Sequence, residues 1–283
     1  MKVLVTGSSG RIGSAIAMAI AKTHDVVGLD IVAGPRTTRL GSINNSQLVD
    51  ELTATVDAVI HTAALHAPHI GVKPDTAFHE TNICGTECLV DAALKHGVGR
   101  FIFTSSTSVY GAAMVAADHA VWVTEELLPI ARDVYDDTKL AAEQICRSAA
   151  AAGLACISLR MSRCFPEPDE LMAIYRLYRG VDARDVAQAH LLALEVELDG
   201  FEIFNISAAP VFQRDECAEL LVSADRVIRR HHSWSMEAFA RRGWALPKHI
   251  DRVYVISKAE RMLGYRPRYN FESLFGSGEL TPG

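Results

Sequence analysis

Tyr135 and Lys139 have residue types and a spacing that suit proton transfer. Residues four apart on a helix share one face, so the Lys139 ammonium would lie near the Tyr135 phenol. A nearby positive charge lowers the pKa of a tyrosine, which then serves as a general base toward an alcohol. Ser106 follows an apolar run upstream and would hold the substrate oxygen against Tyr135, with Ser108 as its nearest rival.

A glycine-rich turn near the N-terminus is a second feature with a chemical role: Thr6-Gly7-Ser8-Ser9-Gly10-Arg11-Ile12-Gly13. It stands between an apolar run and a helical pattern, where glycines let the backbone approach a pyrophosphate. The following helix would add free N–H groups and a positive dipole end. We therefore expect a dinucleotide to contact Gly7, Ser9, Gly10, Arg11, Ile12 and Gly13.

An acidic residue, Asp30, lies 17 residues after Gly13, at the end of the next apolar run. This spacing is close to that of an acid that binds a ribose 2′-hydroxyl. A carboxylate there would repel a 2′-phosphate, so the sequence favours NAD over NADP as cofactor. Arg36 and Arg39 lie downstream, so NADP stays an alternative cofactor.

Alternating strand and helix patterns predict the elements that position these residues. Strands are expected at Lys2–Thr6, Val26–Leu29, Asp57–His61, Arg100–Ser105, Leu154–Arg160 and Phe201–Ile206. Helices are expected at Arg11–Lys22, Asn44–Leu52, Ala77–Lys95, Arg132–Ala152, Asp182–Glu195, Arg214–Val222 and Ser257–Leu263. The alternation implies an α/β fold with a Rossmann-type, doubly wound parallel sheet. Residues 1–160 would form the NAD-binding domain and residues 161–283 a small substrate-binding lobe, with residues 182–207 returning to the sheet.

The composition excludes several other classes of protein. The 283 residues include 28 Lys+Arg and 34 Asp+Glu, a net charge of −6, which argues against a nucleic-acid surface. The chain has no run of about 18 apolar residues, and it reaches a glycine too early for a signal peptide, so we expect a cytoplasmic protein without a membrane segment. No histidine or cysteine spacing matches a metal site, and the six cysteines are expected to be small buried thiols.

The motifs, taken in order, resemble those of extended short-chain dehydrogenase/reductases in the NAD-dependent epimerase/dehydratase family. The matching segments run nearly end to end: the glycine turn, Asp30, His61-Thr62-Ala63-Ala64, Asn82-x-x-Gly85-Thr86, Ser105-Ser106-x-x-Val109-Tyr110-Gly111, Tyr135-x-x-x-Lys139, Arg160, Val181-Asp182-Ala183-Arg184-Asp185-Val186-Ala187, Ser257-Lys258-Ala259 and Leu263-Gly264-Tyr265-x-Pro267. The resemblance implies that Tyr135 takes a proton from a substrate hydroxyl while hydride passes to nicotinamide. Lys139 would hold the nicotinamide ribose and Ser106 the substrate oxygen. Further cofactor contacts are implied at Ser42, Ile43, Ala63, Ala64, Thr104, Tyr135 and Lys139.

The chain departs from the family pattern in ways that bear on the substrate. Ser42 stands where the family usually has an aspartate near adenine, so this contact would be weaker or different. Thr107 and Ser108 stand where related dehydratases carry two acids, which counts against dehydration. Asp182 follows Arg160 by only 22 positions, and this short stretch favours a small substrate without a nucleotide.

The segment Pro166-Glu167-Pro168 is similar to the corresponding stretch of uronate dehydrogenases. Candidates to bind a substrate carboxylate are Arg163, Arg176 and Arg179, although solvated surface arginines would look the same. Loop residues after the strands, His66, His69 and Trp122, are candidates for the substrate wall or for purely structural roles.

These observations favour an NAD-dependent oxidoreductase that moves hydride between NAD and a small sugar, sugar acid or related hydroxy compound. One alternative is an epimerase that retains its cofactor and acts on a sugar or nucleotide sugar. Another is a non-catalytic regulator that binds NAD(P). The resemblance also implies a homodimer through the helices at Ala77–Lys95 and Ala141–Ala152, with packing inside one chain as the alternative.

Overall fold

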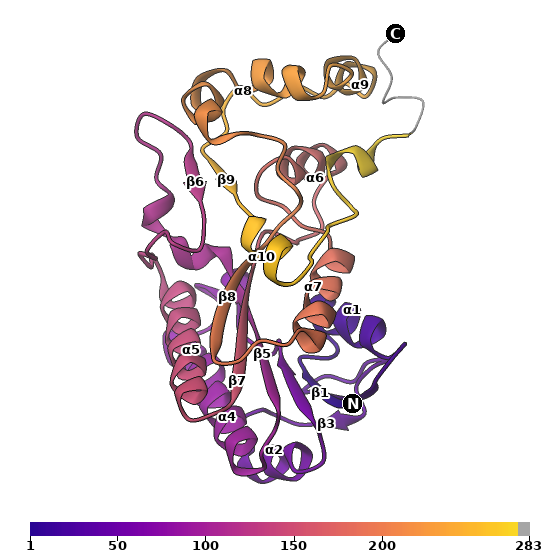
Figure 1. Cartoon of the computed structure of the whole chain (residues 1–283), viewed down its shortest axis with the longest axis vertical. Coiled ribbons are helices and arrows are strands. Elements are labelled where there is room, and N and C mark those ends of the chain that lie inside the picture. Colours follow the sequence, from indigo (N-terminus) through magenta and orange to yellow (C-terminus); the bar gives the residue numbers. More distant parts are fainter. Residues whose placement is uncertain (277–283) are drawn as a thin grey trace.

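Seven parallel strands form the central sheet in the computed structural model, which describes residues 1–276 (Figure 1). In spatial order they are β3 (Arg39–Leu40), β2 (Asp25–Asp30), β1 (Lys2–Thr6), β4 (Ala58–His61), β5 (Arg100–Ser106), β7 (Ala155–Met161) and β8 (Phe201–Ile206). Every pairing in this sheet is parallel. The order reverses direction between β1 and β4, so the predicted doubly wound Rossmann-type α/β fold is confirmed.

Helices cover both faces of the sheet because its strands are apolar on both faces. The covering helices are α1 (Arg11–Ile20) and α7 (Ala183–Glu195) on one face, and α2 (Ser46–Thr53), α4 (Gly85–Lys95) and α5 (Val134–Ala151) on the other. Successive side chains of β1 divide between the two layers: Val3 and Val5 pack with α1 and α7, whereas Leu4 packs with the opposite helices. This alternation is the period of two that a strand imposes.

The helix predicted over 77–95 begins earlier and contains a π-helical turn. Its parts are α3 (Asp75–Phe78), the π turn (His79–Cys84) and α4. Within the turn, the buried amide of Asn82 bonds the backbone of Leu65 and the hydroxyl of Thr138, 3.0 Å away. The turn thus ties the loop after β4 to the helix α5.

A smaller lobe lies beyond the C-terminal ends of the strands (Figure 1). Its regular elements are β6 (Val121–Val123), α6 (Asp169–Arg176), α8 (Cys217–His231), α9 (Ser235–Arg241), β9 (Arg252–Tyr254) and α10 (Ser257–Met262). Short 3-10 turns lie at Ala67–His69, Thr107–Tyr110, Ala112–Met114, Arg214–Glu216 and Phe271–Leu274. The predicted helix Arg214–Val222 is one such turn followed by the longer α8, and β6, β9, α6 and α9 were not predicted. Aromatic and aliphatic side chains share the lobe core, and the Trp234 ring stacks on Phe271 there.

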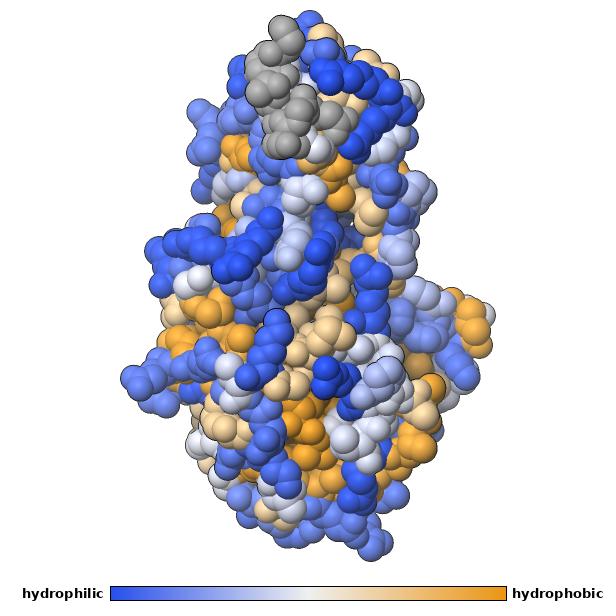
Figure 2. All heavy atoms as spheres, turned by 90° about the vertical axis from the view of Figure 1, so that its right-hand side faces the viewer, coloured by the Kyte–Doolittle hydropathy of each residue, from blue (hydrophilic) through white to orange (hydrophobic). Residues whose placement is uncertain are grey.

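The chain returns from the lobe to the sheet through α7 and β8. Helix α7 packs on α1, and β8 pairs with β7 at the sheet edge. On the side of α1 and α7, the molecular surface is mostly hydrophilic, with hydrophobic residues in smaller patches (Figure 2). Among the described residues, no helix has the length and apolarity needed to cross a membrane.

Candidate active site

The glycine turn between β1 and α1 brings backbone segments so close that side chains would not fit. A Cβ added to Gly13 would lie 2.0 Å from the carbonyl oxygen of Gly7. Gly7 has a φ of +72°, and its Cβ would lie 2.7 Å from Thr62 Oγ1. Only glycine tolerates both conditions. Gly10 precedes α1 without a side-chain cap, so the first N–H groups of the helix stay available to an anionic ligand.

Asp30 lies at the end of β2, next to this turn. One carboxylate oxygen accepts a hydrogen bond from the Ser9 N–H at 2.8 Å, and the other accepts one from the Val32 N–H at 3.0 Å. The hydroxyl of Ser9 bonds Thr37 at 2.6 Å, so the segment after β2 folds over the turn. The predicted acid is therefore held beside the predicted pyrophosphate cradle.

The other predicted cofactor contacts lie along the same edge of the sheet. Ile43 is buried, and a Cβ on Gly85 would lie 2.4 Å from its Cδ1 atom. The Ser42 hydroxyl accepts from the Asn44 N–H at 3.1 Å. Partly buried residues that follow β4, on the other side of β1, are Ala63 and Ala64. The exposed Arg11 reaches across to the Cys164 thiol beyond β7.

Ser106, Tyr135 and Lys139 meet at the C-terminal end of β5. Tyr135 lies in the first turn of α5, and its phenol hydrogen-bonds Ser106, the last residue of β5. One helical turn later, the buried Lys139 ammonium donates to the Thr104 carbonyl at 2.8 Å and lies 4.5 Å from the centre of the Phe103 ring. The structure therefore brings the three predicted catalytic residues together.

Burial controls the charge of both titratable groups. It raises the pKa of Tyr135 to about 12, against the Ser106 hydrogen bond, while Asp136 and Asp133 raise it further. Burial also lowers the pKa of Lys139 to about 8, against the attraction of Glu143. The lowered tyrosine pKa expected from the spacing is thus wrong for this structure, because desolvation of the phenol outweighs the favourable interactions. Tyr135 is protonated here at neutral pH.

Thr104 acts on Lys139 through its backbone. Its carbonyl accepts from the ammonium, whereas its buried hydroxyl bonds His190 Nε2 at 2.8 Å. The Nδ1 atom of His190 bonds the Val186 carbonyl at 2.8 Å, so Nδ1 carries the proton and Nε2 accepts from Thr104. Sequence reasoning placed Thr104 against the cofactor and missed His190, whose position four residues after Val186 in a predicted helix was the only signal.

The predicted substrate residues His66 and Arg163 both lie against the ring of Phe165, so the three side chains form one wall. The His66 ring stacks on Phe165 with 6.0 Å between centroids, and the Arg163 guanidinium lies 5.1 Å from the Phe165 ring centre. Arg163 also pairs with Glu167, its Nε 2.8 Å from the carboxylate. The loops after β4 and β7 therefore meet, at an aromatic residue that the sequence analysis did not single out.

Other predicted substrate residues take different places. The Ser108 hydroxyl is buried and interacts with Asp136, so it faces the protein interior rather than an open site. Arg176 is buried and pairs with Asp182 at 3.0 Å. The Arg179 guanidinium stacks on Tyr175 at 4.5 Å, and no ion pair holds it within residues 1–276. Two predicted loop residues are also engaged: His69 accepts from the His66 N–H, and Trp122 lies on β6 against the lobe core.

The fold and the glycine cradle define an enzyme built on a dinucleotide-binding sheet, with a serine, tyrosine and lysine at the strand ends. Residues 3–170 match the NAD dependent epimerase/dehydratase family. The chain belongs to this family and is an NAD-dependent enzyme of the extended short-chain dehydrogenase/reductase type.

Relatives and solved structures agree with this assignment. A dTDP-glucose 4,6-dehydratase of Streptomyces antibioticus is 29% identical, over 96% of this chain and 89% of the relative. A UDP-glucose 4-epimerase of Halalkalibacterium halodurans is 30% identical over 51% of this chain, which spans 45% of that relative. The structure of MoeE5 in complex with UDP-glucuronic acid and NAD is 25% identical, with a TM-score of 0.72 over 97% of this chain and 96% of that one. A short-chain dehydrogenase/reductase superfamily protein from Agrobacterium tumefaciens, with bound NAD, shares the fold at a TM-score of 0.73 and 21% identity, over 97% of this chain and 94% of that one.

Proposed function

We propose that this protein is a dehydrogenase that oxidises a hydroxyl group of a small sugar, sugar acid or related hydroxy compound and releases NADH. The observation that carries the proposal is the meeting of Ser106, Tyr135 and Lys139 beside the glycine cradle. The short segment after β7, with Arg163 and Phe165, supports a small substrate. In this proposal residues 1–160 form the NAD-binding domain, and residues 161–283 mainly form the substrate-binding lobe.

The proposed chemistry divides among three side chains. Bound NAD supplies the hydride acceptor, its nicotinamide ring. Tyr135 first releases its own phenol proton to solvent, and the resulting phenolate takes the proton of the substrate hydroxyl, while Ser106 holds the same oxygen by a hydrogen bond. Lys139, fixed by the Thr104 carbonyl, presents its remaining N–H groups to the cofactor ribose. Its positive charge favours the Tyr135 phenolate that must be present before the substrate proton is taken.

The glycine turn between β1 and α1 and the residues around it supply the proposed NAD contacts. The backbone of Gly7, Ser9, Gly10 and Gly13, with the α1 N-terminus, suits a pyrophosphate. Asp30 supports NAD over NADP because its carboxylate can accept from a ribose 2′-hydroxyl and would repel a phosphate. Arg11, Ile12, Ser42, Ile43, Ala63 and Ala64 complete the proposed contact set.

Charge at the proposed substrate wall favours an acidic substrate. Arg179 stacks on Tyr175 and makes no ion pair in the described chain, so it is the best candidate to meet a substrate carboxylate. Arg163 would first have to leave Glu167. An Arg179→Gln variant is expected to raise KM for a sugar acid about tenfold, while KM for the neutral parent sugar stays unchanged. Equal changes for both substrates would argue against this role.

The second candidate is an epimerase that returns the hydride to the opposite face of its substrate. The similarity to the UDP-glucose 4-epimerase of Halalkalibacterium halodurans favours it, and it would use the same three catalytic residues. The substrate panel that separates the two contains free sugars, uronates and nucleotide sugars, each incubated with protein and NAD. Growth of NADH absorbance at 340 nm supports the dehydrogenase. A converted nucleotide sugar in the NMR spectrum, without NADH growth, supports the epimerase.

A non-catalytic NAD-binding regulator is the remaining alternative. It predicts that a Tyr135→Phe variant keeps its cellular function, whereas either enzyme predicts loss. The location also stays a prediction: the acidic, membrane-segment-free sequence favours the cytoplasm.

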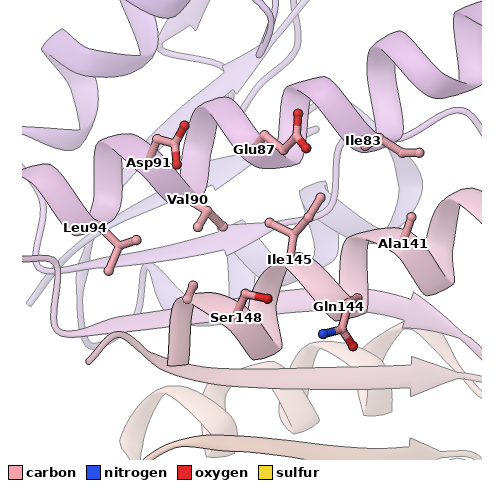
Figure 3. A pocket seen from close by; sticks show the side chains of 10 residues that line it. Ile83, Glu87, Val90, Asp91, Leu94, Ala141, Gln144, Ile145 and Ser148 are labelled. Atoms are coloured by element: carbon pink, nitrogen blue, oxygen red, sulfur yellow. The ribbon is translucent and has the colours of Figure 1, made fainter. Parts of the chain in front are cut away.

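We further propose a homodimer through α4 and α5. A groove runs between these helices, with Val90 and Leu94 on α4 across from Ile145 on α5 (Figure 3). Its rim carries Glu87 and Asp91, whose side chains point away from the groove floor. An apolar floor with a polar rim is the pattern of a protein interface.

A further inference from the structure

A buried carboxylate, that of Asp136, lies next to the catalytic tyrosine and has no part in the chemistry described above. Its side chain is 0% exposed, although it belongs to the first turn of α5. Buried carboxylates are rare without strong partners, because removing a charge from water is costly. The partners of Asp136 therefore indicate what it does.

Those partners tie the start of α5 to the turn after β5. One Asp136 oxygen accepts from the Arg132 N–H at 3.3 Å. The Ser108 hydroxyl interacts with the Asp136 carboxylate and lowers its pKa; both this hydroxyl and the other Asp136 oxygen are buried, and neither completes a hydrogen bond within residues 1–276. The N–H of Ser108 in turn donates to the Ser106 hydroxyl oxygen at 3.1 Å. A path of interacting polar groups thus runs from Asp136 through Ser108 to Ser106, and Ser106 bonds Tyr135.

We propose that Asp136 is a positioning residue that acts through Ser108 to hold the Ser106 hydroxyl in line with the Tyr135 phenol. The inference rests on the proposed function, because it takes Ser106 and Tyr135 as the reacting pair. Ser106 belongs to β5 and Tyr135 to α5, so their contact depends on how firmly these two elements are joined. The Asp136–Ser108 interaction joins them one residue from Tyr135 and two residues from Ser106.

The carboxylate also affects the charge of the phenol. Its negative charge raises the pKa of Tyr135, as does that of Asp133. The charged groups that face Asp136 are Arg132 and Asp133 from the start of α5, while the turn after β5 contributes the neutral Ser108 hydroxyl. Burial raises the pKa of Asp136 itself, but the group is ionised at the alkaline pH where a phenol titrates. Removing this charge should therefore let Tyr135 ionise at lower pH.

The test uses Asp136→Asn, which keeps the shape and removes the charge, with Asp137→Asn as the matched control. Asp137 is exposed on the same helix turn, so its variant makes an equal change in net charge. In Asp136→Asn we expect kcat to fall roughly tenfold, because the reacting groups are less well aligned, with KM and NAD affinity unchanged. The limb of kcat/KM that rises with Tyr135 ionisation should move to lower pH. The control Asp137→Asn should change neither kcat nor the pH dependence of kcat/KM.

Ser108→Ala gives a second path to the same test if Asp136→Asn does not fold. It should lower kcat by a similar factor, and the double variant should lose no more than either single one, because both act along one path. A variant that changes only the melting temperature, with kcat and the pH limb as in the wild type, would overturn the proposal.

A readout that needs no substrate separates this inference from the proposed function. Phenolate absorbance at 295 nm, taken as the difference between protein with Tyr135 and the same protein with Tyr135→Phe, follows the ionisation of this phenol alone. It should occur at lower pH in Asp136→Asn than in the wild type. Absence of NADH formation by the wild type would count against the dehydrogenase, whereas an unchanged phenol titration in Asp136→Asn would count against Asp136.

Discussion

Two buried histidines, His61 and His190, are neutral in the folded protein. His61 bonds Thr6 and Thr86, and His190 bonds Thr104 and Val186. Burial lowers the pKa of His61 to about 3 and that of His190 to about 4. In the unfolded chain both would titrate near the ordinary value of about 6.5. Folding therefore favours the neutral forms.

These histidines predict a loss of stability in acid. Because their folded pKa values are depressed, their contribution is complete above about pH 6.5 and falls as pH drops toward 4. Each histidine should remove at most about 1.4 kcal/mol of unfolding free energy per pH unit. Urea unfolding between pH 6.5 and 4.5 measures this slope. A His190→Gln variant should have a shallower slope than the wild type, whereas exposed His249→Gln should not; equal slopes in all three would contradict the assignment.

At this scale the sequence predicted residue types better than residue environments. Ser106, Tyr135 and Lys139 were found because their spacing has chemical meaning on a strand end and a helix. Asp136, Phe165 and His190 were missed because their roles arise from contacts with distant segments. Ser108 was predicted to face substrate because it is two residues from Ser106, but the chain turns into a 3-10 helix there and buries its hydroxyl.

The turn between β1 and α1 allows a prediction at the scale of elements. Gly13→Ala should disrupt the turn, because the new Cβ would lie 2.0 Å from the Gly7 carbonyl oxygen. We expect a stability loss on the order of 3 kcal/mol and weaker NAD binding. Gly97→Ala is the control: Gly97 has a φ of +66° but no atom within 4 Å of the added Cβ, so it should cost only about 1–2 kcal/mol and leave NAD binding unchanged.

Calorimetry and NAD titration on the two variants give the comparison. If Gly13→Ala bound NAD as tightly as the wild type, the close backbone approach would not be the reason for glycine at this position.

Long apolar segments were the predictable elements. The strands Lys2–Thr6 and Phe201–Ile206 have the predicted bounds, and the other predicted strands shift by a residue at one or both ends. The three-residue strands β6 and β9 were missed because they are too short for a period, and they pair across more than a hundred residues. The π turn at His79–Cys84 depends on buried contacts of Asn82 that no helical pattern reveals.

For the whole molecule, the proposed dimer gives a direct prediction. Ile145→Asp places a charge in the groove between α4 and α5, so it should convert a dimer into a monomer. Size-exclusion chromatography with light scattering measures the mass. Val222→Asp, at a residue 70% exposed on α8, is the control and should leave the mass unchanged. A wild-type monomer, or a dimer that survives Ile145→Asp, would rule out this interface.

The overall path of the chain was predictable for its first part and only partly for its second. The motifs of residues 1–160 occur in the order that the parallel sheet requires. The order of elements in the lobe was not predictable, because its core combines aliphatic residues of α8 with aromatic residues of α9 and the 3-10 turn at Phe271–Leu274, and irregular segments separate these elements. In this second part the sequence predicted α7, β8, α10 and the beginning of α8, because their helix and strand patterns are regular.

Rapid mixing of wild-type and Tyr135→Phe protein with NAD and an active substrate, followed at 340 nm, tests the central claim that Tyr135 transfers the proton during hydride transfer. The first-turnover rate should fall by about a hundredfold or more in the variant, while NAD affinity should change little, because the glycine cradle is untouched and phenylalanine keeps the ring of Tyr135. A first-turnover rate equal to that of the wild type would contradict the account, because proton transfer would then need no phenol at this position.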